Sequence, residues 1–94
     1  HLCFARLGGE EFAAIGLLSQ QQASDLCEQI RLAAEQSFSS QIPYTVSIGY
    51  TTGSITDHQK PAVNSLLETA DFALYQAKTS GRNRVCFQLF MAGM

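Results

Sequence analysis

The chain has 94 residues and a mass of 10.3 kDa, which allows a single domain near the lower end of the usual size range. Hydrophobic residues make up 46% of the chain, too many for a disordered protein. Charged residues make up 15%, against about 25% in an average domain, which indicates a surface that is partly covered by something else. The net charge of −2 excludes a diffuse electrostatic attraction to nucleic acid or to anionic lipid.

No stretch approaches the roughly 18–20 apolar residues of a membrane span. The three cysteines, Cys3, Cys27 and Cys86, are widely spaced and include no C-x-x-C pair, which argues against a disulfide scaffold or a zinc site. This usage favours a reducing compartment, so we expect a cytoplasmic protein. The chain opens on His1 inside a strand-like run, so we expect the natural N-terminus to lie elsewhere.

The first predicted elements form a β-hairpin. Residues 2–7 and 12–18 are apolar, strand-like runs, and the Gly8-Gly9 pair between them supplies the positive φ angles of a tight turn. Gly16 falls inside the second run, where it predicts a bulge or a close backbone approach.

Ser19 is predicted to open a helix, because Ser19 and Gln22 fit a capping box that satisfies two backbone N–H groups. Residues 37–41, rich in Ser and Gln, end this helix. Its apolar stripe is formed at helical spacing by Leu26, Ile30, Ala33 and Ala34. Polar residues that fall mainly on other faces are Asp25, Glu28, Gln29 and Arg31.

Residues 45–51 alternate apolar with small or polar side chains, which predicts a half-buried strand. After a polar loop, Asn64 or Ser65 caps a second helix, with Ser65 and Glu68 as another capping box. Gly81 ends this helix, and residues 84–89 form a closing strand. The apolar stripe of the second helix consists of Leu66, Ala70, Ala73, Leu74 and Ala77. The element order predicts an α+β fold in which the helices cover one face of a sheet.

The hairpin tip is the first candidate for chemistry. Adjacent carboxylates at Glu10 and Glu11 are expected to raise the pKa of one of the two or to recruit a cation, and their hard oxygens suit Mg²⁺. Gly8 and Gly9 carry no side chain, so a bulky ligand can approach the backbone there. The alternative is a solvated turn with surface acids.

The polar face of the second helix is the other candidate, with Asp71, Tyr75 and Lys78 followed by Arg82. Lys78 and Arg82 are four residues apart near the helix C-terminus, where two cations can clamp a phosphate chain. The alternative is that they only offset the negative end of the helix dipole. Ser47 and Gly49 share one face of the strand between these features, and alone they indicate nothing more than a strand.

Taken together, residues 6–13 (RLGGEEFA), 46–49 (VSIG) and 70–85 (ADFALYQAKTSGRNRV) closely resemble the GGDEF family of diguanylate cyclases, in its GGEEF variant. The resemblance covers residues 2–87. It implies a palm-like, ferredoxin-like fold with an antiparallel or mixed sheet, related to class III nucleotide cyclases and polymerases.

The resemblance also implies a reaction in bacterial second-messenger signalling. Two GGDEF domains each bring one GTP into a shared site, each 3′-hydroxyl attacks the other nucleotide's α-phosphate, and pyrophosphate leaves as cyclic di-GMP forms. Gly8 and Gly9 would border the nucleotide, while Glu10 would bind Mg²⁺ where the 3′-hydroxyl is deprotonated, supported by Glu11. Lys78 and Arg82 would hold the β- and γ-phosphates. The implied cofactor is Mg²⁺, two ions per GTP site, and the partners are GTP and a second GGDEF domain, with no nucleic acid and no membrane contact.

In this family a strand and two helices precede the hairpin and carry a metal-binding aspartate and two guanine-recognising residues. These have no counterpart in this sequence, so we expect residues 1–94 to be a partial GGDEF domain that alone neither cyclises GTP nor selects guanine. In the family, that first strand lies in the middle of the sheet. Without it, an unpaired sheet edge is exposed, which should favour self-association.

Many family members also carry an R-x-x-D site at which the product inhibits the enzyme. Product inhibition through that site is doubtful here, because Leu2 stands at the place of its aspartate. The alternative function is a non-catalytic module that binds nucleotide or acts as a scaffold.

Overall fold

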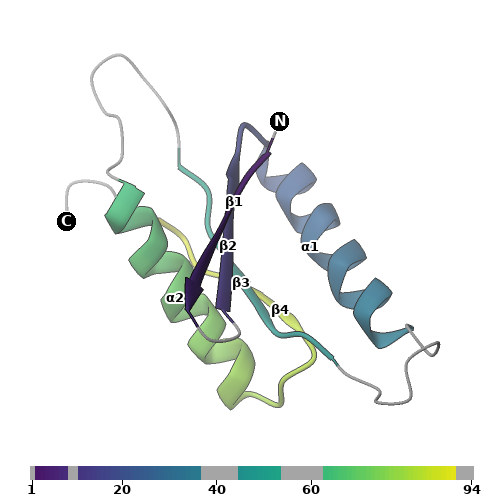
Figure 1. The fold of residues 1–94 in the computed structure, drawn as a ribbon. Helices are drawn as coiled ribbons and strands as arrows, with labels where there is room; N and C mark the ends of the chain where they lie inside the picture. The colour runs from purple at the N-terminus through teal and green to yellow at the C-terminus, as the bar shows by residue number, and fades with distance from the viewer. Residues whose placement is uncertain (1, 9–10, 37–44, 54–62, 91–94) are drawn as a thin grey trace.

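The computed structural model describes residues 2–8, 11–36, 45–53 and 63–90 (Figure 1). In Figure 1 the strands lie between the helices. The elements are β1 (Leu2–Gly8), β2 (Glu11–Gly16), α1 (Gln20–Glu35), β3 (Ile48–Tyr50), α2 (Val63–Thr79) and β4 (Val85–Phe87). This order of elements confirms the predicted α+β class. Within the described residues the strands form two separate two-stranded sheets, however, instead of the single sheet that we expected.

The first sheet is the predicted hairpin. β1 and β2 pair antiparallel from Leu2 opposite Gly16 to Gly8 opposite Glu11. The register shifts between Arg6 and Gly8, so Leu7 is an extra residue on β1. The irregularity therefore lies next to the glycine-rich turn. The bulge predicted at Gly16 is not found, because Gly16 pairs with Leu2 and is the last residue of β2.

Helix α1 begins as predicted, with Ser19 as its N-cap and the capping box formed in both directions. The Gln22 backbone N–H donates to Ser19 Oγ at 3.1 Å, and the Ser19 N–H donates to Gln22 Oε1 at 2.9 Å. The predicted apolar stripe is partly wrong, since Ile30 is 46% exposed while the Arg31 side chain is only 16% exposed. The reason is that Arg31 is held by polar partners between α1 and the second sheet.

The second sheet is a β–α–β unit in which β3 and β4 pair in parallel and α2 is the crossover. A parallel pair needs such a long connection, because a tight turn cannot join strands that run the same way. Ile48, Gly49 and Tyr50 face Val85, Cys86 and Phe87 in register. The predicted strands at 45–51 and 84–89 are thus present in shorter form, and the Tyr50 and Phe87 rings lie 5.1 Å apart.

The packing of α2 on β3 depends on small residues. Ala73 and Ala77 are fully buried, which confirms the centre of the predicted stripe. A Cβ on Gly49 would lie 2.0 Å from the Leu74 backbone nitrogen and 2.5 Å from the Ala70 carbonyl oxygen. The backbones of β3 and α2 therefore approach more closely than any side chain at position 49 permits.

The predicted cap of α2 is wrong. The helix already includes Val63, so Asn64 and Ser65 lie inside its first turn, and the Ser65 carbonyl accepts a hydrogen bond from Thr69 Oγ1 at 3.0 Å. Serine inside a first turn can resemble a cap in sequence, because the same side chain satisfies backbone groups at neighbouring positions. Gly81 ends the helix as predicted, with a φ angle of 132°.

Candidate functional site

The acidic hairpin turn lies at the end of the β1–β2 ladder. Gly8 and Glu11 form the last backbone pair before the turn, so two of the four predicted hairpin residues close the ladder opposite each other. Gly9 and Glu10 lie outside the described residues, and of Gly8 and Glu11 only the backbone is described. The roles predicted for these four residues therefore remain predictions.

The basic residues lie at the C-terminal end of α2. Lys78 is in the last turn, half-buried, and Arg82 follows three residues after the helix ends, with an exposed side chain. The Arg82 backbone N–H donates to the Ala77 carbonyl at 2.9 Å, the long-range bond of a Schellman-type helix end around Gly81. Because the chain leaves the helix here, helical spacing alone does not set where the Arg82 side chain lies relative to Lys78.

The turn after α2 has an uncommon backbone. Arg82 and Asn83 both adopt left-handed conformations, with φ angles of 62° and 47°. Such conformations cost about 1–3 kcal/mol for residues other than glycine, although asparagine tolerates them better than most. Two consecutive left-handed residues persist only where surrounding contacts hold them.

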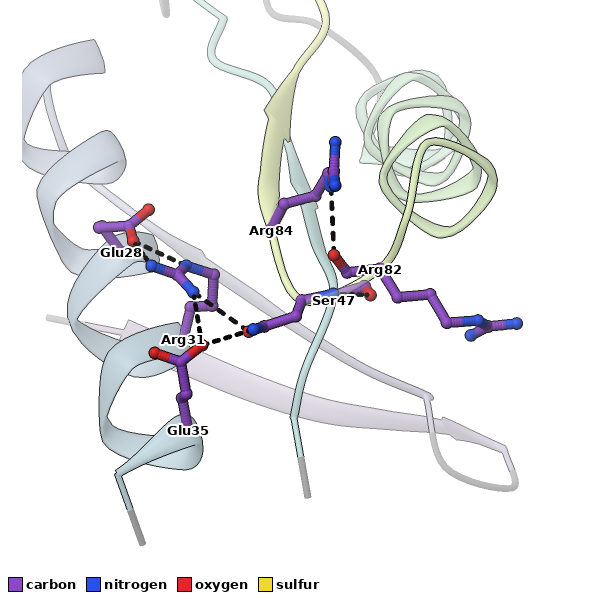
Figure 2. A network of polar contacts seen from close by, with 7 residues as sticks. Glu28, Arg31, Glu35, Ser47, Arg82 and Arg84 are labelled. Atoms are coloured by element: carbon purple, nitrogen blue, oxygen red, sulfur yellow. Dashed lines mark hydrogen bonds and ion pairs between the residues drawn. The ribbon is translucent and has the colours of Figure 1, made fainter. Parts of the chain in front are cut away.

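Those contacts come from α1 and from the segment that leads into β3. The Asn83 N–H donates to Ser47 Oγ at 3.2 Å, and its side-chain Nδ2 donates to Glu35 Oε2 at 2.5 Å. Arg31 Nη1 donates to Asn83 Oδ1 at 3.1 Å. Further along the turn, Arg84 Nε donates to the Arg82 carbonyl at 3.1 Å (Figure 2).

The guanidinium of Arg31 lies between two carboxylates of its own helix. It forms an ion pair and hydrogen bonds with Glu28, three residues earlier, and lies 3.6 Å from Glu35, four residues later (Figure 2). The hydrogen bond to Glu28 raises the pKa of Arg31, so this side chain stays positively charged. Arg31, Glu35, Asn83 and Ser47, which we call the turn anchor, thereby join three separate elements.

The thiol of Cys27 lies on the same helix. Burial raises the pKa of Cys27, and the neighbouring Glu28 carboxylate raises it further. A thiol that stays protonated is a poor nucleophile and a poor metal ligand.

The sequence of the hairpin turn supplies hard oxygen donors for a metal. Adjacent carboxylates at positions 10 and 11 are the donor type that Mg²⁺ takes, together with phosphate oxygens. The part of the chain that the structure describes contains no group of three His, Cys, Asp or Glu residues able to hold a metal ion. It also contains no helix that is long and apolar enough to cross a membrane.

The comparison with known proteins bears on both the hairpin turn and the turn after α2. The family model described as "Diguanylate cyclase, GGDEF domain" matches residues 2–84, a range that includes both turns. The chain belongs to the GGDEF family. The match runs from the first strand of the hairpin to the end of the turn that carries Arg82 and Asn83.

Several curated relatives are similar to most of this chain. Diguanylate cyclase A of Treponema denticola is 36% identical over 86 residues, which cover 86% of this chain and 22% of that protein. Diguanylate cyclase DgcS of Shewanella oneidensis is 37% identical over 84 residues, covering 89% of this chain and 27% of that protein. The biofilm architecture maintenance protein MbaA of Vibrio cholerae is 38% identical, covering 88% and 11%. The chain thus spans about a quarter or less of the length of these relatives.

The turn anchor is not predicted by the sequence patterns. Helical spacing places Arg31 on the polar faces of its helix, and Asn83 enters only as part of a family motif. The acids three residues before and four residues after Arg31 are a signal that its charge is paired. An asparagine two residues after a helix-ending glycine, as Asn83 is after Gly81, is a signal for a left-handed turn.

Proposed function

We propose that this chain is part of a diguanylate cyclase that condenses two GTP molecules into cyclic di-GMP and pyrophosphate in the bacterial cytoplasm. The observation that carries the proposal is the family match over residues 2–84, which includes the acidic hairpin turn and the basic turn after α2. A palm-like arrangement of the complete domain, with a second GGDEF domain as the catalytic partner, belongs to the same proposal.

The residues of the hairpin turn are of the types that metal binding in this reaction requires. Phosphoryl transfer is catalysed by positioning the reactants and by stabilising charge on the phosphate oxygens. Glu10 and Glu11 would hold Mg²⁺, which lowers the pKa of a bound hydroxyl and neutralises charge on phosphate. Gly8 and Gly9 would leave room beside the nucleotide, because neither carries a side chain.

The residues at the end of α2 and in the turn that follows are of the types that phosphate binding requires. Lys78 would act as a point charge, and Arg82 as a planar fork that donates two parallel hydrogen bonds to phosphate oxygens. The exposed side chain of Arg82 and its anchored backbone support this role. These two cations would bind the β- and γ-phosphates, which leave as pyrophosphate.

The test is product formation by the full-length protein with GTP and Mg²⁺, measured by liquid chromatography and mass spectrometry. Glu10→Gln preserves the size of the side chain but removes its charge, so we expect cyclic di-GMP formation to fall at least about 100-fold, as when a preorganised charge-stabilising group is lost. Glu68→Gln, an exposed acid on α2, is the matched control and should retain activity. Equal activity of the Glu10→Gln protein and the wild type would contradict the proposal.

The 94-residue chain is a second arm of the same test. We expect it to form no cyclic di-GMP above a Glu10→Ala background, since it has no counterpart of the family's metal-binding aspartate. Robust product from this chain alone would show that expectation to be wrong. A full-length protein that binds GTP without turnover would instead favour the non-catalytic scaffold.

A further inference from the structure

The turn after α2 is held by hydrogen bonds from three elements. α2 contributes the Ala77 carbonyl, which accepts from the Arg82 N–H at 2.9 Å. The segment leading into β3 contributes Ser47 Oγ, which accepts from the Asn83 N–H at 3.2 Å. α1 contributes Arg31 and Glu35, which bind the Asn83 side chain. A backbone with two consecutive left-handed residues is thereby fixed at one place relative to both helices.

Asn83 is the residue on which these contacts converge. Both polar atoms of its side-chain amide bind residues of α1: Oδ1 accepts from Arg31, and Nδ2 donates to Glu35. An aspartate at this position would bring two carboxylates together, and an apolar residue would leave the half-buried Arg31 without this acceptor. Only a side chain with a donor and an acceptor on one plane satisfies both partners.

Arg82 lies next to Asn83 but takes no part in the side-chain contacts of the turn anchor. Figure 2 shows its side chain extending away from Arg31 and Glu35, while its carbonyl accepts from Arg84 Nε at 3.1 Å. The direction of a long exposed side chain is set by the backbone from which it leaves. Whatever holds residues 82 and 83 in their left-handed conformations therefore also sets where the Arg82 guanidinium can reach.

We propose that Asn83 is a positioning residue, which holds the turn so that Arg82 meets the terminal phosphates of the bound nucleotide. The inference rests on the proposed function, since it assumes that Arg82 binds phosphate. A guanidinium forms two parallel hydrogen bonds with phosphate only in one relative orientation. Preorganising that orientation lowers the cost of ordering the side chain when the nucleotide binds. Asn83 contributes to phosphate affinity through Arg82 without touching the nucleotide itself.

The test uses ligands that report binding without turnover. 3′-Deoxy-GTP carries the triphosphate but lacks the attacking hydroxyl, whereas GMP lacks the β- and γ-phosphates. Both are titrated calorimetrically into the full-length protein in the presence of Mg²⁺. Loss of one charge-assisted contact corresponds to about a tenfold loss of affinity or more. We therefore expect Arg82→Ala and Asn83→Asp each to weaken 3′-deoxy-GTP binding about tenfold and to leave GMP binding within about twofold.

A reciprocal exchange is the control for the turn anchor. The double variant Asn83→Asp with Glu35→Gln places an amide on α1 and a carboxylate on the turn. The new amide donates to the new carboxylate, so the contact returns with the donor and acceptor exchanged and the net charge unchanged. We expect this double variant to recover most of the lost 3′-deoxy-GTP affinity. Asn83→Asp placed in an Arg82→Ala background should cause no additional loss, because the residue acts through Arg82.

The outcomes separate the inference from the proposed function. If Arg82→Ala weakens 3′-deoxy-GTP selectively but Asn83→Asp does not, the positioning role is refuted and the proposed function stands. If Asn83→Asp weakens GMP as much as 3′-deoxy-GTP, its effect is general unfolding and the inference fails. If Arg82→Ala changes neither affinity, the phosphate role of Arg82 and the inference fail together. Should Asn83→Asp not fold, Ser47→Ala, which removes only the acceptor beside β3, must show the same selective loss.

Discussion

Gly49→Ala tests the close packing of β3 against α2. The added Cβ would lie 2.0 Å from the Leu74 nitrogen, 2.5 Å from the Ala70 oxygen and 2.6 Å from the Ala73 carbonyl carbon. An ordinary contact between heavy atoms needs about 3.5 Å, so α2 would have to move by roughly 1.5 Å. All three atoms belong to the helix backbone, and no side-chain rotation can relieve the clash.

The expected cost follows from what such a movement exposes. Overpacking a well-packed site costs about 1–3 kcal/mol, and we expect the upper end here because α2, with its fully buried Ala73 and Ala77, would move away from the second sheet. A loss of about 3 kcal/mol is a large fraction of the roughly 5–15 kcal/mol that stabilises a typical domain.

Urea unfolding followed by circular dichroism measures this loss. Gly53→Ala, at an exposed glycine three residues after β3, is the matched control and should change the free energy of unfolding by no more than about 0.5 kcal/mol. A Gly49→Ala protein that is as stable as this control would refute the packing argument.

Two further predictions concern α1. Ser19→Ala removes the acceptor for the Gln22 N–H and should lower the free energy of unfolding by about 1 kcal/mol, measured by urea unfolding; an unchanged urea midpoint would show that the capping box adds nothing. Burial and the Glu28 carboxylate raise the pKa of Cys27, so at a given alkaline pH it holds less thiolate than an unperturbed cysteine. Its alkylation by iodoacetamide, followed peptide by peptide in a mass spectrometer, should therefore reach half its maximal rate at a higher pH than in the urea-unfolded chain. Glu28→Gln should shift that midpoint downward, and an upward shift would contradict the electrostatic cause.

Local signals in the sequence predict the elements well. The hairpin, the Ser19 capping box and the glycine that ends α2 each depend on residues close together in the chain, so their physics is visible in a short window. The alanine stripe of α2 is equally visible, because helical periodicity marks the buried face. The false cap at Ser65 shows the limit of this reasoning, since a serine within the first turn of a helix carries nearly the same local pattern as a capping serine.

The candidate site is predictable in a different way. Its residues follow from a family resemblance, and the family membership is confirmed over residues 2–84. The contacts of Asn83 are not predictable, because its partners Glu35 and Ser47 lie 48 and 36 residues away in sequence. Pairings between distant polar groups depend on how α1 packs against the turn, and no periodic pattern encodes that packing.

The same distance explains why the turn anchor can matter for function. A left-handed Arg82 is unfavourable in isolation, so its conformation depends on contacts that form only when α1, β3 and α2 are assembled. Phosphate binding at Arg82 would therefore be coupled to the packing of the whole second sheet. By this reasoning Gly49→Ala, although it lies on β3 and changes no charge, should also weaken 3′-deoxy-GTP binding relative to GMP, because moving α2 moves the Ala77 carbonyl that holds the Arg82 N–H. A Gly49→Ala protein that is destabilised yet keeps the full preference for the triphosphate would show that the turn is held by α1 and the segment leading into β3, without α2.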